Sequence, residues 1–219
     1  MNDEITLQEL AYSILFETYY IEEVDYPLEF DKTIFNSLNH KKRIEYAKSF
    51  MKKIGAGSSR IVFDLDASTV LKVAKTAAGI AQNETEVDVY RAFKPSCVAV
   101  VYDYDNENYT WIEMEKAKKA KPSDFAKILK INFINFTEIM MYWYDKTIGS
   151  SRYSNKPVNY DNFTSTDFFY DLEQLIGNYD MPIGDIIRIS SWGVVNRNGL
   201  DTLVLIDFGV TKDILRQYY

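Results

Sequence analysis

The segment Gly55-Ala56-Gly57 is the first part of the chain whose residue types could bind a ligand. It comes just before a run of β-forming residues, where glycines let backbone N–H groups approach phosphate oxygens closely. A tight turn is the commoner explanation of two such glycines. No Gly-Lys-Ser or Gly-Lys-Thr sequence follows, which excludes a P-loop, and the following strand argues against a dinucleotide-binding fingerprint.

A lysine inside an apolar strand is the second feature. Lys72 lies within the run 70–75, and a buried ammonium group needs a carboxylate or an anion as its partner. The helix expected after this strand supplies two candidates, Glu84 and Glu86. Taken alone, such a lysine and glutamate more often make an ordinary surface contact.

The third feature is the carboxylate of Asp207, which directly follows the apolar run 203–206 and precedes Phe208 and Gly209. A carboxylate at the carboxyl end of a buried strand is well placed to hold a metal ion that binds phosphate. A turn-forming aspartate before a glycine is the alternative interpretation.

The spacing of apolar residues predicts the elements that would position these side chains. We expect helices over residues 5–24, 39–53, 79–93, 124–148 and 166–176. We expect strands over residues 60–65, 68–74, 97–102, 109–114, 192–195 and 203–206, with a hairpin turn at Asn198-Gly199. Gly55 would end the second helix, residues 116–122 would form a connector, and a short polar tail would follow Gly209.

In this order the features resemble those of the protein-kinase-like superfamily: a glycine loop on the first hairpin, a strand lysine, a helix glutamate, two strands, a connector, helices, a hairpin and Asp-Phe-Gly. The resemblance covers residues 54–213 and is most specific at Val70-Leu71-Lys72 and Asp207-Phe208-Gly209. The chain is more similar to the compact, divergent kinase-like proteins of bacteria and bacteriophages than to eukaryotic protein kinases.

The resemblance implies an α+β, bilobal fold with a small antiparallel sheet lobe and a reduced helical lobe. On this basis residues 1–53 would be an N-terminal helical extension and residues 54–116 the kinase-like N-lobe. Residues 117–219 would be the reduced C-lobe, which contains the Asp-Phe-Gly hairpin.

The resemblance also implies a site for ATP. Lys72 would hold the α- and β-phosphates, with Glu86 as its helix partner and Glu84 as the second choice. The glycine loop would cover the phosphates, and a hinge would offer backbone groups to the adenine. The residues implied in these two contacts are Gly55, Gly57, Glu113 and Glu115.

A magnesium ion and a catalytic base are implied in the second lobe. Asp207 would bind Mg²⁺, and Ser190 or Ser191 stands where the family has an asparagine as second ligand. Asp185 occupies the place of the catalytic aspartate, which would orient a substrate hydroxyl and accept its proton. A carboxylate that only pairs with Arg188 is the alternative.

Several departures from the family pattern leave the function open. Arg60 replaces the third glycine of the loop, Ile183-Gly184 replaces the usual His-Arg, and ten residues follow Gly209, too few for an activation loop. One hypothesis is an ATP-dependent phosphotransferase that acts on a hydroxyl of a protein or small molecule. The other is a catalytically degenerate, pseudokinase-type scaffold that binds a protein partner, such as a viral protein acting on a host factor. In a third hypothesis, the chain binds no nucleotide and the motifs are relics of the fold.

Composition and charge exclude other classes. The 219 residues are 47% hydrophobic, and 32 Asp+Glu against 25 Lys+Arg give a net charge of −7. An acidic surface disfavours nucleic acid and anionic membranes, and no apolar run reaches the length of about 18 residues that a membrane span needs. One Cys and one His exclude an internal disulfide and a multi-histidine metal site. We therefore expect a cytoplasmic protein, in the host cytoplasm if it is viral, with a nucleotide and, for the scaffold, a protein as partners.

Overall fold

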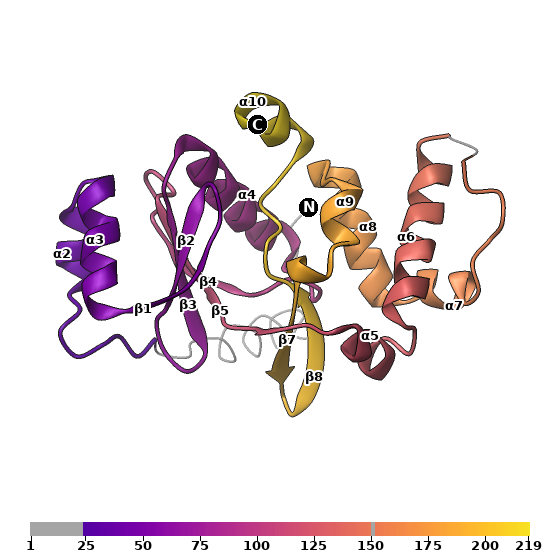
Figure 1. Ribbon diagram of the computed structural model, residues 1–219, viewed down its shortest axis with the longest axis horizontal. Coiled ribbons are helices and arrows are strands. Elements are labelled where there is room, and N and C mark those ends of the chain that lie inside the picture. Colours follow the sequence, from indigo (N-terminus) through magenta and orange to yellow (C-terminus); the bar gives the residue numbers. More distant parts are fainter. Residues whose placement is uncertain (1–23, 150–151) are drawn as a thin grey trace, which may run out of the picture.

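Two lobes lie side by side, and each is built around its own antiparallel sheet (Figure 1). The computed structural model describes residues 24–149 and 152–219, so the helix expected over 5–24 lies almost entirely outside the described residues. Helices pack on both sheets, and the expected α+β class is confirmed.

The first lobe contains a five-stranded sheet in the order β1-β2-β3-β5-β4. The strands are β1 (Lys52–Ala56), β2 (Arg60–Asp64), β3 (Thr69–Ala74), β4 (Val101–Tyr104) and β5 (Trp111–Glu115). Every residue of the central strand β3 is buried. In register, Val62 of β2 and Ile112 of β5 flank Lys72, so the three side chains share one face of the sheet.

The two faces of this sheet have different covers. On one face lie α2 (Lys32–Ser37) and α3 (His40–Phe50), and on the other lies α4 (Ala77–Phe93) (Figure 1). The first face forms an apolar cluster of residues from both helices, their flanks and the strands: Phe30, Phe35, Ala47, Met51, Ile61, Phe63, Leu65, Leu71, Val73 and Trp111. Residues 30–51 therefore share a core with the sheet.

The helix expected over 39–53 is shorter than predicted, because α3 ends at Phe50 and residues Lys52–Ala56 form the edge strand β1. This strand is mostly exposed and its pairing with β2 shifts between Lys53 and Gly55, so it shows no alternating pattern. Pairing with β2 overrides the helical pattern that the sequence continues through residue 51.

The second lobe contains a three-stranded sheet made of β6 (Lys118–Lys119), β7 (Trp192–Arg197) and β8 (Leu200–Leu205). Asn198 and Gly199 both have positive φ, as the predicted two-residue turn between β7 and β8 requires. Helices surround this sheet: α5 (Pro122–Ile128), α6 (Phe133–Thr147), α7 (Tyr160–Thr164), α8 (Asp167–Tyr179), α9 (Ile183–Ile186) and a 3-10 helix (Ile189–Ser191).

Two expectations for the second lobe were wrong. The single helix expected over 124–148 is divided into α5 and α6, since Lys130 takes a positive φ and the side chain of Asn132 caps the start of α6. Apolar residues continue through this turn and hide it in the sequence. The expected polar tail is a helix, α10 (Lys212–Tyr218), which packs against α4 of the first lobe (Figure 1).

One continuous apolar core joins the lobes, because side chains from α4, β5, α6, α8 and β8 belong to the same cluster. The buried Cys97 is part of it and lies in a turn, because the strand expected over 97–102 forms later, as β4 over Val101–Tyr104. Among the helices of the described residues, none combines the length and the hydrophobicity that a membrane crossing requires.

Candidate functional site

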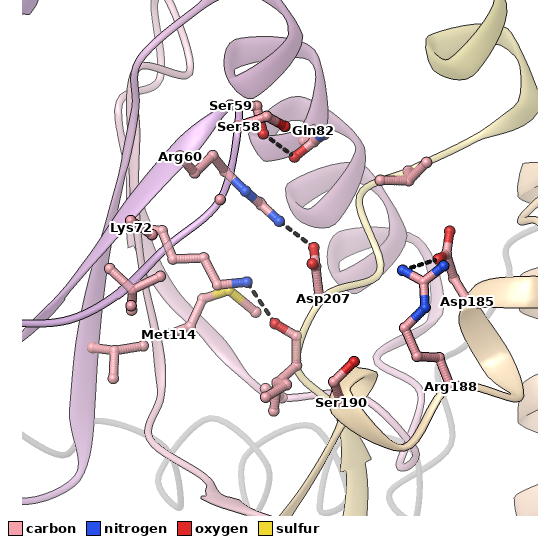
Figure 2. A pocket seen from close by; sticks show the side chains of 18 of the residues that line it. Ser58, Ser59, Arg60, Lys72, Gln82, Met114, Asp185, Arg188, Ser190 and Asp207 are labelled. Carbon is pink, nitrogen blue, oxygen red and sulfur yellow. Dashed lines mark hydrogen bonds and ion pairs between the residues drawn. The ribbon is translucent and has the colours of Figure 1, made fainter. Parts of the chain in front are cut away.

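A cavity of about 700 Å³ opens between the two lobes and gathers most of the residues that the sequence singles out. Its walls come from the glycine segment, β2, β3, the end of β5, α9 and the segment after β8 (Figure 2). The predicted site residues that line it are Gly55, Gly57, Lys72, Glu115, Asp185, Ser190 and Asp207.

Lys72 and Glu86 form the ion pair that the sequence predicts. The Nζ of Lys72 lies 2.9 Å from the nearer carboxylate oxygen of Glu86, and the two side chains are 7% and 0% exposed. The alternative partner Glu84 is exposed. Lys75, the other lysine of this run, donates to the carbonyl of Gly57 instead, so Lys72 is the lysine that pairs with Glu86.

The Asp-Phe-Gly segment is tied to this pair through its backbone. The Nζ of Lys72 donates to the carbonyl oxygen of Ile206 at 2.7 Å (Figure 2), and the N–H of Phe208 donates to Glu86 at 3.2 Å. Gly209 packs so closely on α4 that a Cβ atom there would lie 2.3 Å from the carbonyl oxygen of Gln82. Glycine is therefore required for steric reasons, and the close approach holds Asp207 at the cavity.

Arg60 is the site residue whose contacts the sequence analysis missed. Its guanidinium lies 2.8 Å from Glu86 and 2.5 Å from Asp207, and it donates to Asn83 at 3.2 Å. The sequence could have indicated this position. Arg60 lies two residues before Val62 on one strand, so both side chains lie on the same face of the sheet, and Val62 is paired with Lys72. The residue that replaces the third glycine thus enters the site.

Two cations share the one buried carboxylate of Glu86. Burial by itself raises the pKa of Glu86, but the charges of Arg60 and Lys72 outweigh it and hold that pKa below its usual range. Burial also lowers the pKa of Lys72, and the charge of Arg60 lowers it further. Because an arginine keeps its proton in proteins, Lys72 is the cation of this cluster that loses its proton more readily.

Asp185 opens into the same cavity as Asp207 and also pairs with Arg188, at 3.1 Å (Figure 2). Its carboxylate is therefore both at the cavity and paired with Arg188. Burial raises the pKa of Asp185 and the charge of Asp207 adds to this effect, while Arg188 lowers it. Its role as a catalytic base stays a prediction.

The two glutamates of the expected hinge have different partners. Glu115 lines the cavity, with its carboxylate 2.5 Å from Arg197. The side chain of Glu113 lies 2.9 Å from Lys32 and 2.5 Å from the hydroxyl of Tyr26, and contact of its backbone with an adenine stays a prediction. Met114, between them, faces the cavity (Figure 2).

The residues around Asp207 do not fit a ready-made magnesium site. One oxygen of Asp207 is taken by Arg60, and Ser190 offers a hydroxyl, a poorer ligand than a carboxylate. Within residues 24–149 and 152–219, no group of three or more His, Cys, Asp or Glu side chains could hold a metal ion. Ligation of Mg²⁺ by Asp207 and Ser190 stays a prediction.

The end of α10 also reaches the cavity, which the expected polar tail did not indicate. The hydroxyl of Tyr219 accepts from Gln82 at 3.1 Å and lies 3.2 Å from the hydroxyl of Ser58, beside the glycine segment. Burial works against ionisation of Tyr219, but hydrogen bonds from these side chains and the charge of Arg60 leave its pKa lowered.

No family model and no curated protein matches the chain. Solved structures of aminoglycoside phosphotransferases do match. The streptomycin–ATP–APH(2'')-IIa ternary complex has 14% identity and a TM-score of 0.33, over 83% of this chain and 72% of that one. The GDP and kanamycin complex of APH(2'')-IIia has 12% identity and a TM-score of 0.35, over 91% of this chain and 72% of that one. ADP-bound APH(2'')-Ib has 16% identity and a TM-score of 0.33, over 78% of this chain and 71% of that one.

These enzymes have the protein-kinase-like fold that the order of motifs in this sequence resembles.

Proposed function

We propose that the chain binds ATP in the cavity between its lobes and transfers the terminal phosphate to a hydroxyl group. The buried pair of Lys72 and Glu86 carries this proposal, because it borders a cavity and is held by the backbone on either side of Asp207. A buried ion pair contributes little to stability, since desolvation offsets its attraction. Its place beside a cavity of ligand size is better explained by phosphate binding.

The lining of the cavity suits the parts of ATP. Apolar side chains from β2, β3, β5 and the chain before β4 form one wall where an adenine could lie: Val62, Val70, Ala99 and Met114. Backbone groups around Gly57 and the ammonium of Lys72 border the other part, where the phosphates would lie.

Asp185 would act on the acceptor. The hydroxyl oxygen would attack the γ-phosphorus, the bond from phosphorus to the β–γ bridging oxygen would break, and ADP would leave. The proton of the hydroxyl would pass to the carboxylate of Asp185, whose raised pKa favours such a transfer. The pair with Arg188 must open for this step, and the 63% exposure of the Arg188 side chain leaves it room to move.

A scaffold is the second candidate, and specific ion pairs favour it. Asp207 is paired with Arg60 and Asp185 with Arg188, so both carboxylates that phosphotransfer needs are already neutralised. In this case the cavity would bind a nucleotide or remain a relic, and the chain would act by contact with a protein. That protein would be a host factor, met in the host cytoplasm, if the chain is of bacteriophage origin.

A thermal-shift titration with ATP tests nucleotide binding. At about 100 times its dissociation constant, ATP should stabilise the native state by about 2.7 kcal/mol. Lys72→Met should abolish the shift, whereas Lys32→Met, which alters a paired lysine on the opposite face of the sheet, should retain it. If ATP produces no shift in the unmodified chain, with or without magnesium, nucleotide binding is rejected.

Asp185→Asn separates the enzyme from the scaffold. For an enzyme, the variant should bind ATP but lose phosphate transfer by about 10²-fold or more, and biological activity should be lost with it. If biological activity persists in a variant that transfers no phosphate, the phosphotransferase proposal fails and the scaffold stands.

A further inference from the structure

In the part of the chain that the structure describes, each carboxylate that lines the cavity, and Glu86 next to it, is paired with a basic side chain. The pairs are Glu86 with Lys72 and Arg60, Asp207 with Arg60, Asp185 with Arg188, and Glu115 with Arg197. A metal ion recruited by Asp207 would therefore compete with a guanidinium group that is already in place. The same guanidinium is a permanent positive charge where phosphates would lie.

Arg60 is held rigidly in this position. One terminal nitrogen, Nη1, lies 2.8 Å from Glu86 and 3.2 Å from Asn83, and the other, Nη2, lies 3.0 Å from Glu86 and 2.5 Å from Asp207. The side chain is only 7% exposed. Its charge therefore lies between β2 and the Asp-Phe-Gly segment, with Glu86 as the fixed anchor.

The contact with Asp207 is the one that a ligand could replace. The side chain of Asp207 is 58% exposed, whereas that of Glu86 is fully buried. Figure 2 shows the guanidinium of Arg60 directed from β2 toward the carboxylate of Asp207 across the cavity. A phosphate oxygen that displaces Asp207 would meet a guanidinium still held by Glu86, and guanidinium groups bind phosphate well.

We infer that Arg60 takes the place of a divalent cation, so that the cleft binds a nucleoside triphosphate without a bound metal ion. Arg60 and Lys72 together neutralise the phosphates, and Asp207 acts as an exchangeable counter-ion of Arg60 that the phosphates displace. This inference rests on the nucleotide binding proposed above.

Calorimetric titration with ATP, in excess magnesium chloride and in excess EDTA, tests the inference on the full chain. The dissociation constants under the two conditions should agree within about threefold. Asp207→Asn, at an exposed position that should fold normally, should tighten binding by about threefold or more under both conditions, because it removes a negative charge that competes for Arg60.

Arg60→Lys is the second variant, since it keeps a charge near Glu86 but cannot bridge two carboxylates. It should weaken binding in EDTA by about tenfold and recover part of the loss in magnesium, because Asp207 becomes available to the metal. Melting curves without ligand verify that each variant is folded.

The opposite pattern overturns the inference. If the unmodified chain binds ATP at least about tenfold more tightly in magnesium and Asp207→Asn removes that gain, Asp207 is a metal ligand and only the nucleotide proposal stands. If no ATP binds under either condition, both proposals fall.

Discussion

Each face of the five-stranded sheet carries a carboxylate paired with a lysine, and the two pairs differ in what surrounds them. On the face toward the second lobe, Glu86 binds Lys72 and Arg60 beside a cavity. On the opposite face, Glu113 binds Lys32, whose ammonium lies over the ring of Trp111 at 4.9 Å and pairs with Asp103. Buried ion pairing alone does not mark a functional site.

Two physical differences separate these clusters. In the cluster of Glu113, Lys32 of α2 pairs with Glu113 and Asp103 of the sheet and donates to Tyr26. These contacts join α2 to the sheet. The cluster of Glu86 has two cations for one fully buried carboxylate, and it makes up the deficit by reaching Asp207 at the cavity. With Asp207 counted, the cluster of Glu86 has two cations and two carboxylates, and the exposed carboxylate of Asp207 is one that an anionic ligand at the cavity could replace. The cluster of Glu113 has one cation for the two carboxylates of Glu113 and Asp103, and it lies under a helix, as a structural contact does.

The largest expected effect is the loss of stability when the carboxylate of Glu86 or of Glu113 is removed. Glu86→Ala leaves two buried cations with reduced pairing and should lower the free energy of unfolding by about 3–5 kcal/mol. Glu113→Ala should cost about 1–3 kcal/mol, because Lys32 is 30% exposed and keeps Asp103 as a partner. Urea unfolding of the two variants measures the difference, and an equal or larger loss for Glu113→Ala would remove the distinction.

A smaller effect is expected where the cluster of Glu86 is held against α4. Gly209→Ala introduces a Cβ atom 2.3 Å from the carbonyl oxygen of Gln82 and should destabilise the chain by about 1–3 kcal/mol. It should also weaken ATP binding, because Asp207 and Phe208 move with the backbone.

Gly177→Ala in α8 is the matched control. A Cβ there meets nothing within 4 Å, so the better helix propensity of alanine should raise stability by up to about 1 kcal/mol. Melting curves and ATP titrations on both variants check this, and a neutral Gly209→Ala would mean that the close approach does not position the segment.

The smallest effect is a contrast in pH dependence. Two cations hold the pKa of Glu86 low, so its contribution to stability is complete at neutral pH and is lost as the pH falls from about 4.3 through its folded-state pKa. Burial raises the pKa of Glu113, despite Tyr26 and Lys32, so its contribution is complete below about 4.3 and is lost as the pH rises through its folded-state pKa.

The two glutamine variants should reveal these opposite slopes. The measured quantity is the unfolding free energy of the unmodified chain minus that of the variant. As the pH is lowered toward 4, this quantity should fall for Glu86→Gln and should rise for Glu113→Gln. Urea unfolding at a series of pH values measures both, and parallel slopes would contradict the assignment.

Much of the first lobe could be predicted from local patterns. The β-forming runs of β2 and β3 and the helix over 79–93, like the turn at Asn198-Gly199 in the second lobe, are all short-range signals, and the structure confirms them. A lysine in a buried strand requires a partner, which left Glu84 and Glu86 open, and the resemblance to the kinase-like superfamily selected Glu86. The helix break at Lys130 and the edge strand β1 were missed, because apolar residues continue through the first and the second depends on pairing with β2.

The sequence by itself determined which residue types lie on which side of each strand and the order in which the motifs occur. Only the tertiary structure decided which of these faces meet. Arg60 and Asp207 are 147 positions apart, and Tyr26 and Glu113 are 87 apart. Local periodicity places a side chain on a face, but its partner depends on long-range packing of the lobes and of α2 on the sheet. For that reason Arg60 appeared in the sequence as a lost glycine and in the structure as the centre of the site.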